Sequence, residues 1–169
     1  SVVSHASCPV VVVREDNHVT DSTKYGPVVV GVDGSEVSQK ATAYAFREAQ
    51  ARGAALIAVH TWMDMQVQAS LAGLSAAQSE WADIEKEQSE LLAENLKEPR
   101  EEYPDVEVKQ LITRDRPVSA LTEAAEGAQL LVVGSHGRGG FKGMLLGSTS
   151  RALLQSAPCP MMVVRPDED

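Results

Sequence analysis

The stretch Leu130-Leu131-Val132-Val133-Gly134-Ser135-His136-Gly137 is followed, nine residues later, by Gly147-Ser148-Thr149. The apolar run is typical of a buried parallel strand, and the segment from Ser148 to Ser156 has helical spacing. Glycines let a phosphate approach backbone amides, and a helix start supplies unpaired N–H groups with a favourable dipole. The stretch therefore predicts a nucleotide phosphate site. The alternative is that the glycines only form a tight connection between strand and helix.

The spacing of Gly134, Gly137, Gly147 and Ser148 resembles the ATP-binding signature of the universal stress protein family. The order of elements from Pro27 to Arg165 is similar to that family as well. The resemblance is specific in the glycine region and generic elsewhere. It implies a domain that binds ATP and acts as a sensor or regulator.

Composition predicts one domain with an aliphatic core. The chain has 169 residues, of which 43% are hydrophobic and only 4% aromatic, a balance typical of parallel sheets covered by helices. The formal net charge is −9, which disfavours binding to a nucleic-acid backbone. No apolar run is long enough to span a bilayer and no secretory signal begins the sequence, so we expect a cytoplasmic protein. Cys8 and Cys159 form neither a disulfide framework nor a metal cluster, and we expect buried thiols.

The first residues repeat the last ones. Residues 4–14 and 155–165 align at a constant offset of 151, which matches two Cys-Pro pairs, four apolar residues and a closing arginine. We interpret residues 1–14 as the last helix end and last strand of a preceding universal-stress-like domain, so that the chain holds the second copy of a tandem pair. Residues 15–26 are then a linker, 27–165 the domain and 166–169 an acidic tail. The alternative interpretation is that Val10 to Val13 begins this domain as an extra edge strand.

A run of four valines, Val10 to Val13, needs a sheet edge because unpaired backbone beside apolar side chains is costly. Family members commonly associate through their last strands. The resemblance therefore implies that Val10 to Val13 lies antiparallel to Met161 to Val164, either within one chain or exchanged between the chains of a homodimer.

Apolar runs alternate with helical patterns along the domain, which predicts a doubly wound parallel α/β sheet of five strands with helices on both faces. The expected strands are Pro27 to Val32, Ala54 to Thr61, Val106 to Ile112, Leu130 to Val133 and Pro160 to Val164. The expected helices are Glu36 to Arg52, Ser75 to about Glu98, Pro117 to Glu126 and Ser148 to Ser156. Ser35 is the expected N-cap of the first helix and Gly53 its end, while the Pro99 and Pro104 region stops the long helix. Its apolar side should hold Trp81, Ile84, Leu91, Leu92 and Leu96.

Ligands of such sheets bind outside the carboxyl ends of the strands, where the winding reverses. The resemblance places this point between the first and fourth strands, whose ends are Asp33 and Gly134. Asp33 could accept hydrogen bonds from ribose hydroxyls or hold Mg²⁺ between phosphates. Its alternative role is an Asx turn that starts the following helix.

The nucleotide-binding set comprises Asp33, Thr61, Val133, Gly134, Gly137, Arg138, Gly147, Ser148 and Thr149. The resemblance implies that Val133 lines the adenine or ribose and that the backbone near Thr61 meets the adenine edge. Arg138 and Lys142 could neutralise phosphate charge or simply face solvent. The irregular segment from Trp62 to Leu74 is either a lid over the base or a loop with a few core anchors.

No residue pattern favours rapid catalysis. His60 lies in an apolar strand and is interpreted as a satisfied core or pocket-wall histidine, and His136 as a solvent-facing spacer. The lysine of a P-loop is absent, and no G-x-G-x-x-G follows the first strand. We expect a nucleotide-linked regulator with slow hydrolysis at most. The rival hypotheses are a nucleotide-hydrolysing or nucleotidyl-transferring enzyme of the same fold group, and a nucleotide-free interaction module.

Overall fold

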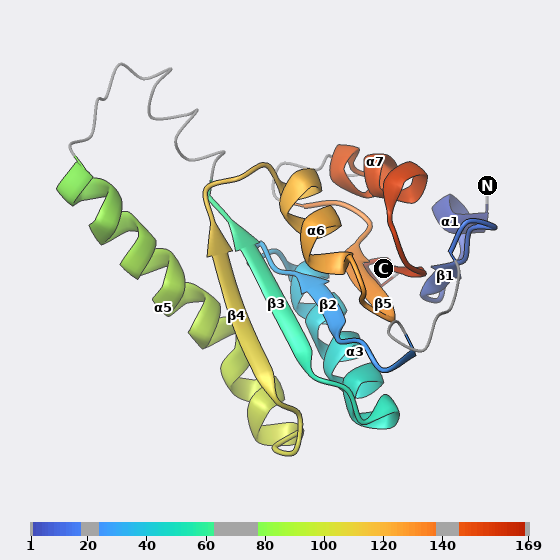
Figure 1. Cartoon of the computed structure of the whole chain (residues 1–169), viewed down its shortest axis with the longest axis horizontal. Coiled ribbons are helices and arrows are strands. Elements are labelled where there is room, and N and C mark those ends of the chain that lie inside the picture. Colours follow the sequence, from blue (N-terminus) through green and yellow to red (C-terminus); the bar gives the residue numbers. More distant parts are fainter. Residues whose placement is uncertain (1, 18–23, 63–77, 138–145, 168–169) are drawn as a thin grey trace.

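The computed structural model describes residues 2–17, 24–62, 78–137 and 146–167 of the chain, without the side chains of residues 78–80 (Figure 1). One six-stranded sheet runs through it in the order β1-β6-β5-β2-β3-β4. The strands are β1 Val10–Val12, β2 Val28–Gly31, β3 Leu56–Thr61, β4 Val108–Thr113, β5 Leu130–Gly134 and β6 Met161–Val164. The helices are α1 Val2–His5, α3 Glu36–Arg52, α5 Gln78–Glu102, α6 Pro117–Ala125 and α7 Ser148–Ser156.

The predicted doubly wound α/β fold is confirmed. Strands β2 to β6 pair with one another in parallel, and β2 lies between β3 and β5 at the point where the winding reverses. The sheet has six strands, whereas five were predicted for the domain, because β1 extends the sheet at the β6 edge.

Helices cover both faces of the sheet. Helices α3 and α5 lie on one face, and α6 and α7 lie on the other (Figure 1). Side chains alternate along each strand, so Val28 and Val30 pack in the core under α3 and α5 while Val29 packs under α6 and α7. Both cores are built mainly from aliphatic residues, as the scarcity of aromatic residues predicts.

Helix α3 has the expected ends. The Ser35 hydroxyl accepts a hydrogen bond from the Ser38 amide at 3.2 Å, which caps the first turn. Gly53 adopts a left-handed conformation with φ of 62° and its amide bonds back to the last turn. The helix starts directly after β2, so its first turn lies beside the carboxyl end of that strand.

Helix α5 ends in the Pro99 and Pro104 region, as predicted, but it extends past the expected end at about Glu98 to Glu102. The Tyr103 amide still donates to the Pro99 carbonyl at 2.8 Å. The proline removes only its own donor, and the following turn is held by Tyr103, which stacks on Phe46 with ring centroids 6.2 Å apart. Leu91, expected on the apolar side, is 45% exposed, whereas Leu92 and Leu96 are buried.

Strand β1 pairs antiparallel with β6, which confirms the predicted pairing. The central pair of this ladder is Val11 with Met162, and these two residues are equivalent in the internal repeat. The arginines that close the two repeated segments also act reciprocally. Arg165 donates to the Ala6 carbonyl after α1, and Arg14 donates to the Gln155 carbonyl in the last turn of α7. The two segments are thus related by an approximate local twofold axis.

The two leucines of α5 provide a test of this packing. We expect Leu96→Ala to lower the free energy of unfolding by about 2–5 kcal/mol, because Leu96 is fully buried in the core under α3 and α5. The matched control Leu91→Ala removes the same atoms from a largely exposed position and should cost less than about 1 kcal/mol. Urea unfolding followed by circular dichroism measures both values, and equal losses would contradict the assigned face of α5.

Candidate functional site

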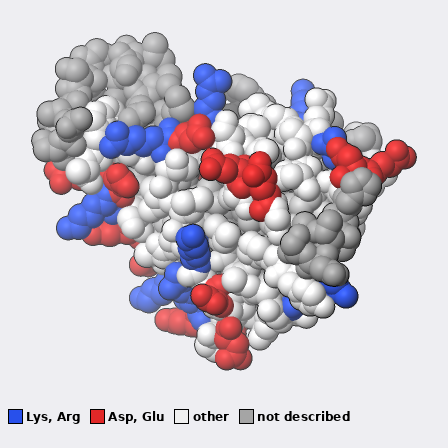
Figure 2. Space-filling model, viewed as in Figure 1, with Lys and Arg blue, Asp and Glu red and all other residues white. Residues whose placement is uncertain are grey.

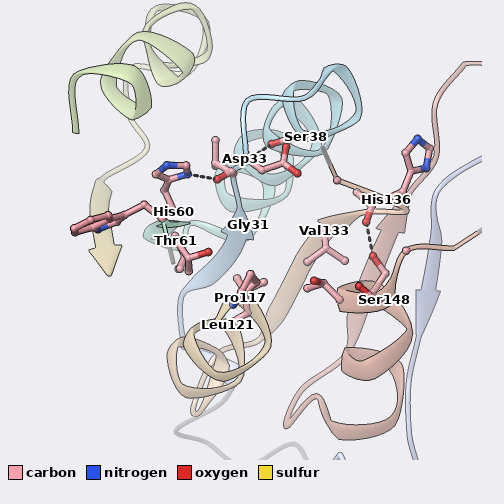
Figure 3. Close-up of a pocket in the computed structure, with 18 of the residues that line it drawn as sticks. Gly31, Asp33, Ser38, His60, Thr61, Pro117, Leu121, Val133, His136 and Ser148 are labelled. Atoms are coloured by element: carbon pink, nitrogen blue, oxygen red, sulfur yellow. Dashed lines mark hydrogen bonds between the residues drawn. The ribbon is translucent and has the colours of Figure 1, made fainter. Parts of the chain in front are cut away.

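A cavity of about 350 Å³ opens at the carboxyl ends of β2, β3 and β5, and the first turn of α7 forms one of its walls. Its volume falls in the range of small-molecule sites. Figure 3 shows His60 and Thr61 at one end of the cavity and His136 and Ser148 at the other, with Asp33 between the two ends.

The cavity brings together the site residues that the sequence predicts within the described part of the chain. These are Asp33, Thr61, Val133, Gly134, Gly137, Gly147, Ser148 and Thr149. Arg138 and Lys142 lie outside the described residues, as does the suggested lid after Trp62. Parallel pairing of β2 with β5 places the ends of these two strands side by side, so Asp33 and Gly134 meet as expected.

Asp33 is held in a fixed orientation by backbone contacts. Its Oδ1 accepts from the Ser35 amide at 2.8 Å, and its own amide donates to the Ser38 hydroxyl at 3.0 Å. This is the Asx turn that the sequence offers as an alternative role. The turn occupies only Oδ1, and Oδ2 lies next to Gly137 in the cavity wall. The turn therefore leaves one carboxylate oxygen available to a ligand.

The glycines of the loop are explained by close approach of backbone to other groups. A Cβ on Gly134 would lie 2.6 Å from Val37 Cγ1, and one on Gly147 would lie 3.0 Å from the His136 Cα. Gly134 is therefore required by packing of the loop against α3, and Gly147 by packing within the loop itself. At Gly137 the added Cβ would instead lie 2.5 Å from Asp33 Oδ2, inside the cavity.

The first turn of α7 presents backbone donors to the cavity. Gly147 is the N-cap residue and no side chain caps this end of the helix. The Gly147 amide is already bound to the Ser135 carbonyl at 2.6 Å, so the amides that follow it are the ones that can reach a ligand. The Ser150 hydroxyl donates to the Gly134 carbonyl at 2.6 Å and fixes the helix against the end of β5. An anion at this place would meet N–H groups and the positive end of the helix dipole.

His60 is a satisfied wall residue, as predicted. It is 8% exposed, with Nδ1 2.7 Å from the Val32 carbonyl oxygen and Nε2 2.8 Å from the Gln88 side-chain amide (Figure 3 shows the first contact). Both ring nitrogens are therefore engaged, which leaves neither of them free to take a proton from a ligand.

Trp62 forms part of the cavity wall at the end of β3 and is 2% exposed. Its ring is 5.7 Å from that of Trp81 on α5, and the guanidinium carbon of Arg114 lies 4.9 Å from its centroid. These contacts fix the ring and join α5 to the ends of β3 and β4.

Sequence reasoning missed several lining residues. On the apolar side these are Gly31, Pro117 and Leu121, and on the polar side Ser38, Gln88 and Ser150. Gln88 could have been found, because it stands in the row formed by Ile84, Leu92 and Leu96 on α5, where a polar residue is unexpected. The others lie in ordinary helical or strand patterns, and only the fold brings them to the cavity.

Two further expectations concern reactive groups. His136 is half-buried and lines the cavity, so it is not a solvent-facing spacer, and its Nδ1 lies 3.1 Å from the Ser135 hydroxyl. Cys159 is buried as expected, and burial raises the pKa of its thiol to about 11, which keeps it in the unreactive protonated form. Cys8 is exposed, which corrects the expectation of two buried thiols.

The described residues contain no group of three or more ligands that could hold a metal ion.

Charge on the surface is mixed. On the face shown in Figure 2, Lys and Arg side chains are interspersed with Asp and Glu, and the described residues there form no continuous basic stripe. None of the described helices has the length and apolar character needed to cross a membrane.

The chain was compared with known proteins. The family model of the universal stress protein family matches residues 24–165. The universal stress protein Rv2005c of Mycobacterium tuberculosis is 47% identical over 165 residues, which cover 98% of this chain and 54% of that protein. The chain therefore spans about half the length of this curated relative.

Solved structures of the family share the fold. A universal stress protein from Archaeoglobus fulgidus is 24% identical with a TM-score of 0.62, over 99% of this chain and 53% of that one. A universal stress protein in complex with cAMP is 25% identical with a TM-score of 0.56, over 83% of this chain and 97% of that one. Sequence and fold agree, and the chain belongs to the universal stress protein family.

Proposed function

We propose that this chain binds ATP together with Mg²⁺ in the cavity and acts as a nucleotide-linked regulator of the stress response in the cytoplasm. The observation that carries the proposal is the cavity itself, in which an available carboxylate oxygen, a glycine loop and an uncapped helix start converge. Each of these groups suits a different part of a nucleotide.

The phosphates would lie at the α7 end. The backbone amides that follow Gly147 and the hydroxyls of Ser148 and Thr149 supply donors there, and Gly137 leaves room beside Asp33. Mg²⁺ is usually held by one or two carboxylates together with phosphate oxygens. Asp33 Oδ2 fits this pattern as the single carboxylate among the described lining residues, so Mg²⁺ would arrive with the nucleotide.

The base would lie at the opposite end, where the wall is largely apolar. Pro117, Leu121 and Val133 line the cavity with Thr61, and a flat purine ring can pack on such a surface. The related protein solved with cAMP supports an adenine nucleotide as the ligand class. Asp33 lies between the two ends, where the ribose hydroxyls would reach it.

A regulatory role is favoured over fast catalysis. The titratable side chains among the described lining residues are Asp33, His60 and His136. His60 has both nitrogens engaged, and Nδ1 of His136 lies 3.1 Å from the Ser135 hydroxyl. Asp33 Oδ1 is used by the Asx turn, and its Oδ2 would be taken by Mg²⁺. We therefore expect no efficient general base for an attacking water. A ligand that binds only the folded form would instead stabilise it by mass action.

We further propose that residues 1–14 are the end of a preceding homologous domain. The approximate twofold relation between α1-β1 and α7-β6 supports this, because equivalent residues pair at the centre and the two arginines act reciprocally. In this arrangement β1 occupies the edge of β6 through which two copies of the domain would otherwise associate.

A charge at the start of α7 tests the phosphate site. We expect Ser148→Glu to weaken MgATP binding at least about tenfold, because the carboxylate would face the phosphates. The same change should not unfold the protein, since an acidic residue in a first helical turn is favourable. The control Ser148→Ala keeps the backbone donors and should lose much less affinity. Isothermal titration calorimetry measures both, and unchanged affinity in Ser148→Glu would refute the phosphate assignment.

The rate of ATP hydrolysis distinguishes the proposed regulator from the alternative hypothesis of an enzyme. We expect multiple-turnover ATP hydrolysis on the order of 10⁻² s⁻¹ or slower, the range of nucleotide switches without an external activator. Asp33→Asn keeps the oxygen that accepts from the Ser35 amide, so the turn should persist. Phosphate release by the purified wild-type chain well above this rate, and lost in Asp33→Asn, would favour the enzyme.

Removal of residues 1–14 tests the role of β1. The shortened chain would leave the apolar edge of β6 unpaired, and we expect it to form dimers through that edge while the whole chain stays monomeric. Sedimentation velocity distinguishes the two states. A shortened chain that remains monomeric and folded would contradict the proposal that β1 covers an edge of β6 through which two copies would otherwise associate.

A further inference from the structure

Gln88 is a buried polar residue in the wall of the cavity. It lies on the core-facing side of α5, is 4% exposed and lines the cavity together with His60. Its terminal amide is 2.8 Å from Nε2 of His60, and Nδ1 of the same ring is 2.7 Å from the Val32 carbonyl oxygen. The three groups form a chain of hydrogen bonds from β2 through β3 to α5.

The partner of Nδ1 decides which nitrogen of His60 carries the proton. A backbone carbonyl can only accept, so Nδ1 must donate to the Val32 oxygen. In a neutral imidazole Nε2 then carries a lone pair. A doubly protonated ring would satisfy both contacts, but it would bury a positive charge against two neutral partners, which is costly.

The tautomer of His60 in turn orients the amide of Gln88. As placed, Oε1 of Gln88 faces Nε2, and two acceptors would oppose each other. The oxygen and nitrogen of an amide exchange places by a rotation of 180°, and the hydrogen-bond network decides between the two orientations. The network here requires the NH₂ group to donate to Nε2, so Oε1 occupies the second amide position.

The second amide position is not used by the His60 ring. Gln88 itself lines the cavity. The contact with His60 thus holds the amide oxygen in a fixed orientation as a hydrogen-bond acceptor. The neighbouring His60 has no free ring nitrogen, because both are engaged.

We infer that Gln88 is a specificity-determining residue, whose Oε1 accepts a hydrogen bond from the exocyclic amino group of adenine. The inference rests on the proposed nucleotide site and adds the identity of the base. His60 lies away from the phosphate end (Figure 3), where the base would be, and Gln88 lines the cavity in contact with His60. A 6-oxo purine would place a second acceptor against Oε1 and leave it unpaired, so hypoxanthine and guanine should be rejected.

Titration of the whole chain with ATP and with inosine triphosphate tests this inference. The two ligands share ribose and triphosphate, so the glycine loop contributes equally to both affinities. We expect the wild type to bind ATP at least about fivefold more tightly than inosine triphosphate, because the lost hydrogen bond leaves a buried acceptor unpaired. Purine riboside triphosphate, which lacks the amino group without gaining an oxo group, should also bind less tightly than ATP.

Variants locate the preference in Gln88. Gln88→Met removes the acceptor and should bring the ratio of the two affinities close to one. Gln50→Met changes an exposed glutamine of α3 and should leave the ratio unchanged. Melting curves without ligand show that each variant is folded, and the wild-type measurements with purine riboside triphosphate stand even where Gln88→Met does not fold.

The outcomes separate this inference from the proposed function. If the wild type binds neither ATP nor inosine triphosphate, the proposed function fails and this inference fails with it. If the wild type binds both equally, the nucleotide site stands and the role of Gln88 is overturned. A preference for ATP that persists in folded Gln88→Met would overturn it as well.

Discussion

Parallel pairing between β2 and β5 is the constraint on which the cavity depends. The ladder joins Val28 to Leu130 and Val30 to Val132, so the two strands end at the same level. The turn after β2 then faces the loop after β5, and Asp33 lies opposite Gly137. Since β3 pairs with the other side of β2, its last residues complete the wall. Backbone hydrogen bonds thus position a site to which six separate stretches of the described residues contribute.

Several residues that line the cavity also hold the helices to the sheet. Asp33 starts α3 through its Oδ1 and leaves Oδ2 in the cavity, while Ser150 fixes α7 to β5 and leaves the first amides of that helix exposed. His60 and Gln88 connect the cavity to α5. A ligand that contacts these groups would therefore act on contacts that hold the helices to the sheet, which is how a nucleotide could regulate stability or association.

At the β6 edge of the sheet, the two repeated segments of the chain pair with each other. Strand β1 pairs with β6 about the equivalent residues Val11 and Met162, and the arginines at the ends of the two segments bind reciprocally. A repeated sequence that pairs with itself in antiparallel fashion places equivalent residues around a twofold axis. The relatives about twice as long as this chain are consistent with a protein built from two such units.

Local patterns in the sequence were sufficient for the fold class, for the cap at Ser35 and the end at Gly53, and for the glycine loop with Asp33, because each depends on neighbouring residues or on a regular period. They were not sufficient for the continuation of α5 through Pro99, the exposure of Leu91 or the presence of Gln88, Pro117 and Leu121 in the cavity wall. These features depend on contacts between segments far apart in the chain, where packing outweighs local preference. The tautomer of His60, and with it the acceptor presented by Gln88, follows from a carbonyl 28 residues away that only the folded chain brings within reach.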